Sequence, residues 1–424
     1  MLHPMDRLPL DVWSHILSYA CTDGGRTGAA LASTSSGIRT ASASHRFYSL
    51  KLTSLAQIGW LLLCLELIGR AESPRLRTAD QGSLNVRHLL LSFFPEDCDS
   101  LSRPWREWGE YSSDHRKREE QIAEDESAWR AAKGAWDRQF TFLAPRLFDL
   151  VAPSLGTLVV LQDPNNPLPY VSVKLLALRE LALLADDGIF VRPAPRWMNR
   201  RTDYDHRDIP PFPLLTHLHI VFEGDKRQWW AKTLPLWAEL APAMTHLRVS
   251  QARNLIPKVP DAMSTSSFPH ANSRPEFEAT SVHPRLQKII IQPERVRGFD
   301  HLEERHVLSS AQDEGRSRIV VLRGRLYRPG YYGDRLGWDW QDRMIGKAGC
   351  WGECEDDEGV WVHEHRKRAE VSAQGASIAR AQKSSARQIK ELIRLDKREG
   401  LLRTLSGGLL GRRAKLFHER AASL

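Results

Sequence analysis

Near the C-terminal end of the sequence, two cysteines and two histidines have a spacing that could bind a zinc ion. Cys350 and Cys354 are separated by three residues, and His363 and His365 by one. Structural zinc sites favour about two to four residues between the cysteines and about three to five between the histidines, so only the cysteine pair fits. Acidic residues also crowd the cysteines. We therefore expect free cysteines here, with zinc binding as the alternative.

No other group of residues has the pattern of a catalytic site. The sequence contains 16 histidines, but no nucleophile elbow, phosphate-binding glycine loop or paired-carboxylate motif accompanies them. The sequence therefore predicts a protein that is not an enzyme and that uses no cofactor. Its function is expected to be binding.

A six-residue pattern recurs along the sequence, with apolar residues at its first, fourth and sixth positions. In four of six copies a proline stands two residues before the first apolar position, where it ends a helix and starts an extended segment. The copies begin at Val86, Leu155, Leu178, Leu215, Met244 and Leu286. A poorer copy follows at Ile319–Leu322. Each copy predicts a β-strand.

A longer self-match indicates that these strands belong to a repeat. Residues 147–158 correspond, 89 residues later, to residues 236–247, each as a short helix, a proline break and a strand. The pattern resembles the leucine-rich repeat, whose units run about 20–29 residues. The resemblance implies an α/β repeat, an irregular leucine-rich-repeat horseshoe, over residues 53–325. Insertions are expected at 92–150, 185–212 and 250–283. The alternative is an α/β domain whose buried parallel strands are alike.

The third and fifth positions of each copy are predicted to lie on an exposed sheet face, because the fourth and sixth point into the core. In the later copies these positions form a ladder of His217, His219, His246, Arg248 and Lys288. Such a ladder suits an acidic or phosphorylated target, and solvated polar residues are the alternative. Because histidine titrates near pH ~6.5, target binding is expected to tighten as the pH falls from about 7.5 to about 6.

The first residues predict a small helical module before the repeat. Pro9 suits the first turn of a helix, and Asp11 places a carboxylate near the positive end of the helix dipole. The helix presents an apolar face that includes Val12, Ile16 and Leu17. Two further short helices are expected, at Ala29–Ile38 and over residues 43–50.

The stretch Leu8-Pro9-x-Asp11-Val12-x-x-x-Ile16-Leu17-x-Tyr19 resembles the opening of an F-box. An F-box is a three-helix module that docks on the Skp adaptor of cullin–RING ubiquitin ligases, and repeats of this kind follow F-boxes in fungal and plant proteins. The resemblance implies an F-box over residues 1–52. It also implies adaptor contacts by Leu8, Pro9, Val12, Ile16, Leu17 and Leu31. The alternative is an amphipathic helix capped by Leu-Pro.

The positive charge of the chain is concentrated at its C-terminal end. The formal net charge is +8, and residues 361–424 hold 15 Lys/Arg and 6 Asp/Glu, which leaves the first 360 residues at −1. A neutral body argues against a nucleic-acid groove. We expect a cap region at 326–362 and then a basic, partly helical tail at 363–424. A nuclear-localisation signal or a patch for an acidic partner is the alternative for the tail.

Cysteine usage and hydropathy favour an intracellular protein. The five cysteines are mostly far apart, which is not typical of a disulfide-stapled secreted module. The longest apolar stretch, Ile58–Ile68, contains Glu66 and is too short to span a bilayer. The first residues have no apolar core of a signal peptide. A cytoplasmic or nuclear location without a membrane partner is expected.

These features predict the substrate-recognition subunit of a Skp–cullin–F-box ubiquitin ligase. Its partners would be the Skp adaptor with the cullin complex, and an unidentified target protein. The repeat would hold the target near the ubiquitin-charged enzyme and so raise its effective concentration. The alternatives are a repeat scaffold outside any ligase, or a nucleic-acid-associated protein that uses the basic tail.

Overall fold

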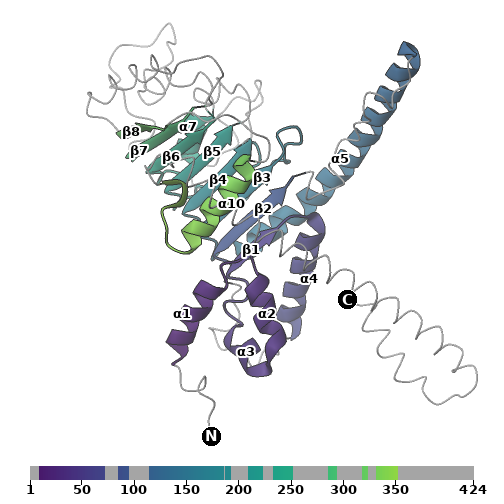
Figure 1. Ribbon diagram of the computed structural model, residues 1–424. Coiled ribbons are helices and arrows are strands. Elements are labelled where there is room, and N and C mark those ends of the chain that lie inside the picture. Colours follow the sequence, from purple (N-terminus) through teal and green to yellow (C-terminus); the bar gives the residue numbers. More distant parts are fainter. Residues whose placement is uncertain are drawn as a thin grey trace, which may run out of the picture. The chain divides into compact units, whose positions relative to one another are not determined.

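The described part of the chain is built on one parallel β-sheet of eight strands, whose neighbours follow chain order, with helices packed against it (Figure 1). This computed structural model describes residues 9–71, 85–94, 114–185, 187–191, 209–222, 233–251, 285–293, 318–322 and 331–351. The strands are β1 (Ser49–Leu52), β2 (His88–Phe93), β3 (Thr157–Gln162), β4 (Glu180–Ala185), β5 (His217–Phe222), β6 (His246–Ser250), β7 (Lys288–Gln292) and β8 (Arg318–Val321). The chain therefore has an α/β fold.

Helices precede, separate and follow these strands. The first three are α1 (Leu10–Ala20), α2 (Arg26–Thr34) and α3 (Ser36–Ala41). They are followed by α4 (Leu55–Ala71), α5 (His115–Val151), α7 (Leu234–Leu240), α10 (Tyr331–Met344) and the 3-10 helix η4 (Gly349–Trp351). The six predicted strands coincide with β2 to β7, and the poorer copy with β8, so these strand predictions are confirmed.

The start of the sheet differs from the prediction. Residues 49–52 form β1, which pairs in parallel with β2, so the helix predicted over residues 43–50 is wrong. Leu50 and Leu52 are both buried and flank an exposed Lys51, and this alternation is the period of a strand. The third helix is instead α3, where the Ser35 hydroxyl accepts a hydrogen bond from the Ile38 N–H (3.2 Å).

The outer edge of β1 is covered by the turn between α1 and α2. The Lys51 N–H donates to the Gly24 carbonyl (3.2 Å), and the Gly24 N–H donates to the Ser49 hydroxyl (3.1 Å). Gly24 has a φ of +77°, a conformation that a side chain disfavours. Because an open strand edge invites further pairing, this turn protects the edge and joins the helical module to the sheet.

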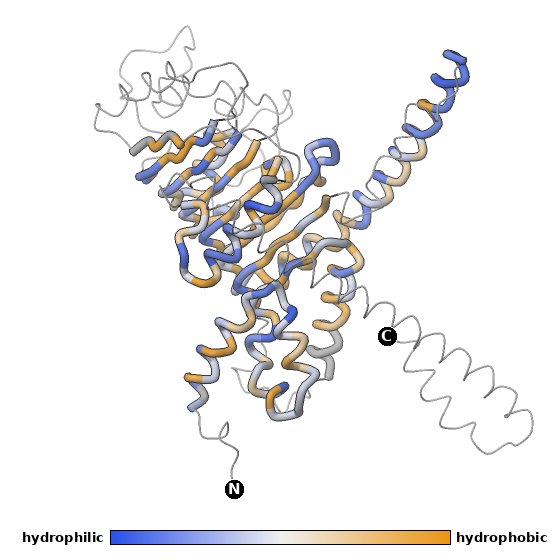
Figure 2. Tube along the Cα trace, in the orientation of Figure 1, coloured by the Kyte–Doolittle hydropathy of each residue, from blue (hydrophilic) through white to orange (hydrophobic). Residues whose placement is uncertain are grey.

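The main core lies between one face of the sheet and helices α4, α5 and α7. The fourth and sixth positions of the repeating pattern point into it, as predicted, and are fully buried from Leu89 and Leu91 of β2 to Ile289 and Ile291 of β7. Figure 2 shows the strands as largely hydrophobic. Apolar burial of this extent is the main source of stability for the sheet.

Helix α5 occupies much of the predicted insertion at 92–150. Its C-terminal half packs on the sheet through a stripe that includes Trp136, Phe140 and Leu147. Its N-terminal half is hydrophilic (Figure 2) and carries ion pairs one turn apart, such as Arg116 Nε to Glu120 (3.2 Å). The predicted insertion therefore contains a helix that packs on the sheet through one stripe, which is buried only from Trp136 onwards.

Candidate functional site

Helix α1 presents an apolar stripe to solvent. Val12, Ile16 and Tyr19 are 37%, 45% and 64% exposed, and their spacing of four and three residues places them on one side of the helix. Isolated apolar residues are common on protein surfaces, but three in one stripe on a short helix have the spacing by which amphipathic helices bind in a partner's groove. We call these three residues the α1 stripe.

Polar contacts hold α1 against the start of the sheet, so the stripe has a fixed direction. The Ser14 hydroxyl is hydrogen-bonded to His45 Nε2 (3.1 Å), and the Ser44 hydroxyl to His45 Nδ1 (2.8 Å). At the end of the helix, the Ser49 hydroxyl donates to the Cys21 carbonyl (2.6 Å). The middle of α1 and its C-terminal end are thus tied to residues 45–49.

The predicted adaptor-binding residues divide between surface and interior. Val12 and Ile16 are on the surface, and Pro9 is exposed directly before the helix. Leu17 is only 3% exposed, so its expected place on the adaptor-facing surface is wrong: it lies on the inward side of α1. Leu31 on α2 is half-buried, and Leu8 lies outside the described residues. Tyr19 joins the surface in place of Leu17.

The other sheet face, expected to be open, is covered. Helix α10 lies across it (Figure 1) and packs against strands β2 to β5. Its inward residues are Tyr332, Leu336, Trp340 and Met344. They meet apolar fifth positions of the repeating pattern, among them Leu90, Val159 and Ala182. Helix α10, the following loop and η4 together form what we call the covering segment (residues 331–351).

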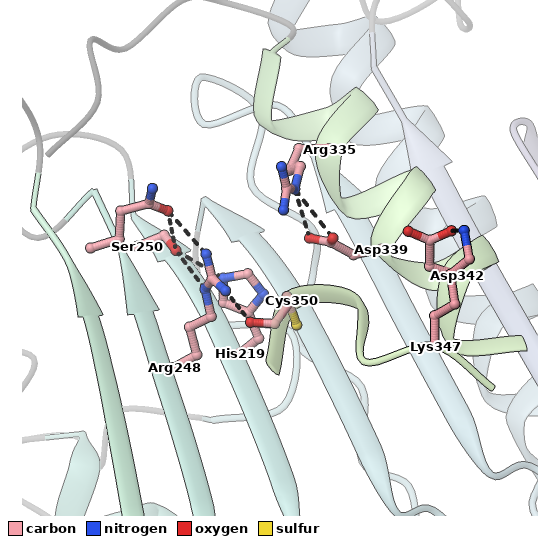
Figure 3. Close-up of polar contacts among 9 residues, drawn as sticks. His219, Arg248, Ser250, Arg335, Asp339, Asp342, Lys347 and Cys350 are labelled. Carbon is pink, nitrogen blue, oxygen red and sulfur yellow. Dashed lines mark hydrogen bonds and ion pairs between the residues drawn. The ribbon is translucent and has the colours of Figure 1, made fainter. Parts of the chain in front are cut away.

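The polar ladder lies under the end of the covering segment, so its predicted exposure is wrong. His219 and Arg248 are 3% and 5% exposed. Figure 3 shows the Arg248 guanidinium donating to the Cys350 carbonyl; it also donates to Gln292 Oε1 (3.1 Å). His219 Nε2 is hydrogen-bonded to the Ser250 hydroxyl (3.0 Å). Substituting His219 and Arg248 would therefore disturb the interior, not a free surface.

The remaining ladder residues surround Trp351. The rings of His217 and His246 are stacked, with centroids 4.3 Å apart, and the Trp351 ring stands edge-on to both. The Trp351 carbonyl accepts a hydrogen bond from Lys288 Nζ (3.5 Å). All five predicted target-binding residues therefore lie together, as the pattern requires, and all five contact the covering segment.

Glu180 on β4 is a central residue of this face that the sequence did not single out. Its Oε1 accepts from the Trp351 indole N–H (3.0 Å), and its Oε2 accepts from Arg343 Nε (2.8 Å). Two signals for the covering segment were present in the sequence. Apolar residues already occupied the fifth positions of β2 to β4, and Tyr332, Leu336, Trp340 and Met344 recur every four residues.

Burial keeps the histidines of this face neutral. Desolvation, together with nearby cationic groups, lowers the pKa of His88 and of His217 to about 4. Burial also lowers the pKa of His219 well below its usual value and lowers that of His246. The expected tightening of target binding between pH 7.5 and 6 requires exposed histidines with an ordinary pKa. These histidines are instead covered and have lowered pKa values, so the basis of that expectation is wrong.

The same shifts predict a loss of stability in mild acid. In the unfolded chain these histidines protonate near pH ~6.5, whereas in the folded chain they resist protonation, so the unfolded state binds more protons as the pH falls. We expect the free energy of unfolding to fall between pH 7 and pH 4 by about 2–3 kcal/mol for each of His88 and His217, the two histidines whose pKa is lowered to about 4. Urea unfolding across this range measures it. In the His217→Asn variant, the free energy of unfolding should fall less steeply with pH. An equally steep fall would contradict the lowered pKa of His217.

Nothing in the described ranges forms a metal site: no group of three His, Cys, Asp or Glu side chains is placed to hold an ion. Cys350 is buried, and burial raises the pKa of its thiol, which disfavours the thiolate that a metal needs. Cys354, His363 and His365 lie outside the described residues, as does the basic tail at 363–424. Among the helices described, none is both long and apolar enough to cross a membrane.

Comparisons of the chain with protein families, curated proteins and solved structures found no match.

Proposed function

We propose that the chain is the substrate-recognition subunit of a Skp–cullin–F-box ubiquitin ligase. In this proposal residues 1–52 are an F-box that binds the Skp adaptor, and the sheet is part of an irregular leucine-rich-repeat horseshoe that holds a target protein. The chain performs no bond chemistry. It acts in the cytoplasm or the nucleus by keeping the target close to the ubiquitin-charged enzyme.

The α1 stripe is the observation that carries this proposal. Val12, Ile16 and Tyr19 are exposed on the first of three short helices, within the stretch that resembles an F-box. Complete burial of a large apolar side chain contributes about 1.5–3 kcal/mol, and each of these three is partly buried already in the free chain. Together they can supply a part of a micromolar affinity of about −8 kcal/mol. A rigid helix with exposed apolar residues is suited to a preformed adaptor groove.

The sheet supports the second half of the proposal. Eight parallel strands follow one another in chain order, and consecutive strands pair in register from Ser49 with His88 to Lys288 with Arg318. Sequential parallel strands with helices returning on one side are typical of stacked repeat units, each of which contacts its neighbours. Such proteins bind partners over an extended surface.

A repeat scaffold that no longer binds an adaptor is the second candidate, because the sheet and its covering segment would serve it equally well. Cellular target levels separate the two. In cells that carry the Ile16→Asp variant in place of the wild-type chain, the targets of a ligase accumulate, and their ubiquitylated forms decrease. Unchanged protein levels, with the variant chain present at normal abundance, would favour the scaffold.

A further inference from the structure

Trp351 is held against the sheet face by a set of complementary contacts. Its indole N–H donates to the Glu180 carboxylate (3.0 Å), and its ring stands edge-on to His217 and His246 at centroid distances of 4.8 and 6.1 Å. It is 8% exposed. We call Glu180, His217 and His246 the indole site. An acceptor for the N–H and two aromatic walls are the features that distinguish tryptophan from other apolar side chains.

The backbone beside Trp351 is recognised as well. The carbonyl of Cys350 accepts from the Arg248 guanidinium, and the carbonyl of Trp351 accepts from Lys288 Nζ (3.5 Å). The two cationic side chains thus bind main-chain carbonyls on both sides of the aromatic ring. Any peptide segment of similar shape has such carbonyls and can make the same contacts. The sheet face therefore contacts residues 350–351 in the way that a protein contacts a bound peptide.

The two parts of the covering segment are attached in different ways. Helix α10 is fixed by four buried apolar side chains. The segment after it is fixed by Trp351 and Cys350, which form a smaller buried cluster with Ile290 and Leu322, and by polar contacts. Glycines with positive φ stand at both ends of the connecting turn, Gly346 (+82°) and Gly349 (+54°). Residues 345–351, which we call the latch, can therefore leave the sheet while α10 stays in place.

We propose that the indole site is the target-recognition site of this protein, that it binds a tryptophan-containing peptide segment, and that the latch occupies it until such a segment displaces Trp351. This inference rests on the proposed function for its biological meaning, but the site itself does not depend on adaptor binding. The segment that fits has tryptophan after small residues, as in Gly349-Cys350-Trp351, so that its backbone carbonyls reach Arg248 and Lys288.

The latch competes strongly with an external peptide, because the short linker gives the latch an effective concentration of about 1 mM or more. Two substitutions in the full chain weaken the latch by unrelated means. Trp351→Ala removes the side chain that fills the site. Gly349→Ala keeps Trp351 but adds a Cβ that would lie 2.8 Å from the Asp339 carbonyl, at a backbone conformation that alanine disfavours.

The test is the binding of a fluorescein-labelled peptide with the sequence of residues 345–351, with serine in place of the cysteine, measured by fluorescence anisotropy. We expect both variants to bind it at least about 10-fold more tightly than the wild-type chain does. A peptide with alanine in place of the tryptophan serves as the matched control and should bind neither. In the Trp351→Ala background, Glu180→Ala should weaken binding about 10-fold, whereas Glu180→Gln, which keeps an acceptor oxygen, should weaken it less.

The outcomes separate this inference from the proposed function. Peptide binding that does not depend on the tryptophan, or variants that bind no better than the wild-type chain, would overturn the indole site. Loss of the folded circular-dichroism spectrum in both variants would also overturn it, since the latch would then be an integral part of the fold. If the variants bind the peptide but no form of the chain binds the Skp adaptor, the indole site stands and the ligase assignment fails.

Discussion

Replacing Ile16 by aspartate is expected to lower the affinity of the chain for the Skp adaptor by about 100-fold or more, without unfolding it. Ile16 is 45% exposed at the centre of the α1 stripe, so the free chain tolerates a polar side chain there. In the complex, the substitution removes apolar burial worth about 1.5–3 kcal/mol and places an unpaired carboxylate in an apolar interface. Isothermal titration calorimetry with the purified adaptor measures the change.

Leu176→Asp provides the matched control. Leu176 precedes β4, outside the helical module, and is 44% exposed, so the control introduces the same charge at an aliphatic residue of equal exposure. Its adaptor affinity should equal that of the wild-type chain. If the Ile16→Asp chain keeps its circular-dichroism spectrum and binds the adaptor as tightly as the Leu176→Asp chain, the α1 stripe does not bind the adaptor.

Phe140→Ala is expected to destabilise the chain by about 3–5 kcal/mol, because it leaves a cavity in the core. Phe140 is fully buried on α5, where its ring stacks on Trp136 (centroids 5.3 Å apart) and meets Phe93 of β2 edge-on at 5.5 Å. The effect tests whether the long helix inserted between β2 and β3 is an integral part of the sheet core. The free energy of unfolding from urea titration measures it.

Phe142→Ala on the same helix is the control for this experiment. Phe142 is 62% exposed two residues further on, and its ring contacts the Arg146 guanidinium at 5.0 Å from the centroid. Because truncating an exposed side chain leaves no cavity, its cost should stay within about 1 kcal/mol. Equal effects of the two substitutions would contradict the packing of α5 on the sheet.

The strands were predictable because their apolar side chains alternate with a period of two residues, which is the period of a β-strand. Leu89 and Leu91, and their counterparts up to Ile289 and Ile291, alternate with residues of the opposite face. In four of the six copies, a preceding proline also marks the start of the strand. Parallel strands covered on both faces have no clean polar side, however. The polar residues His219 and Arg248 therefore indicated an exposed face that the structure covers.

The covering segment could not be placed from its sequence alone. The spacing of Leu336, Trp340 and Met344 predicts an amphipathic helix but not the surface on which it packs, more than 100 residues away along the chain from Leu90, Val159 and Ala182. The contact of Glu180 with Trp351 joins residues 171 positions apart. Such contacts depend on the assembled sheet, and no local pattern encodes them.

Size-exclusion chromatography with light scattering tests the claim that this chain binds the Skp adaptor through its first helix. The purified chain, of 48.3 kDa, is mixed with purified Skp adaptor at about 10 μM, well above the dissociation constant of a stable complex. We predict a single species with the summed mass of one chain and one adaptor, which the Ile16→Asp variant does not form. Two separate peaks from the folded wild-type chain and the adaptor would contradict the claim.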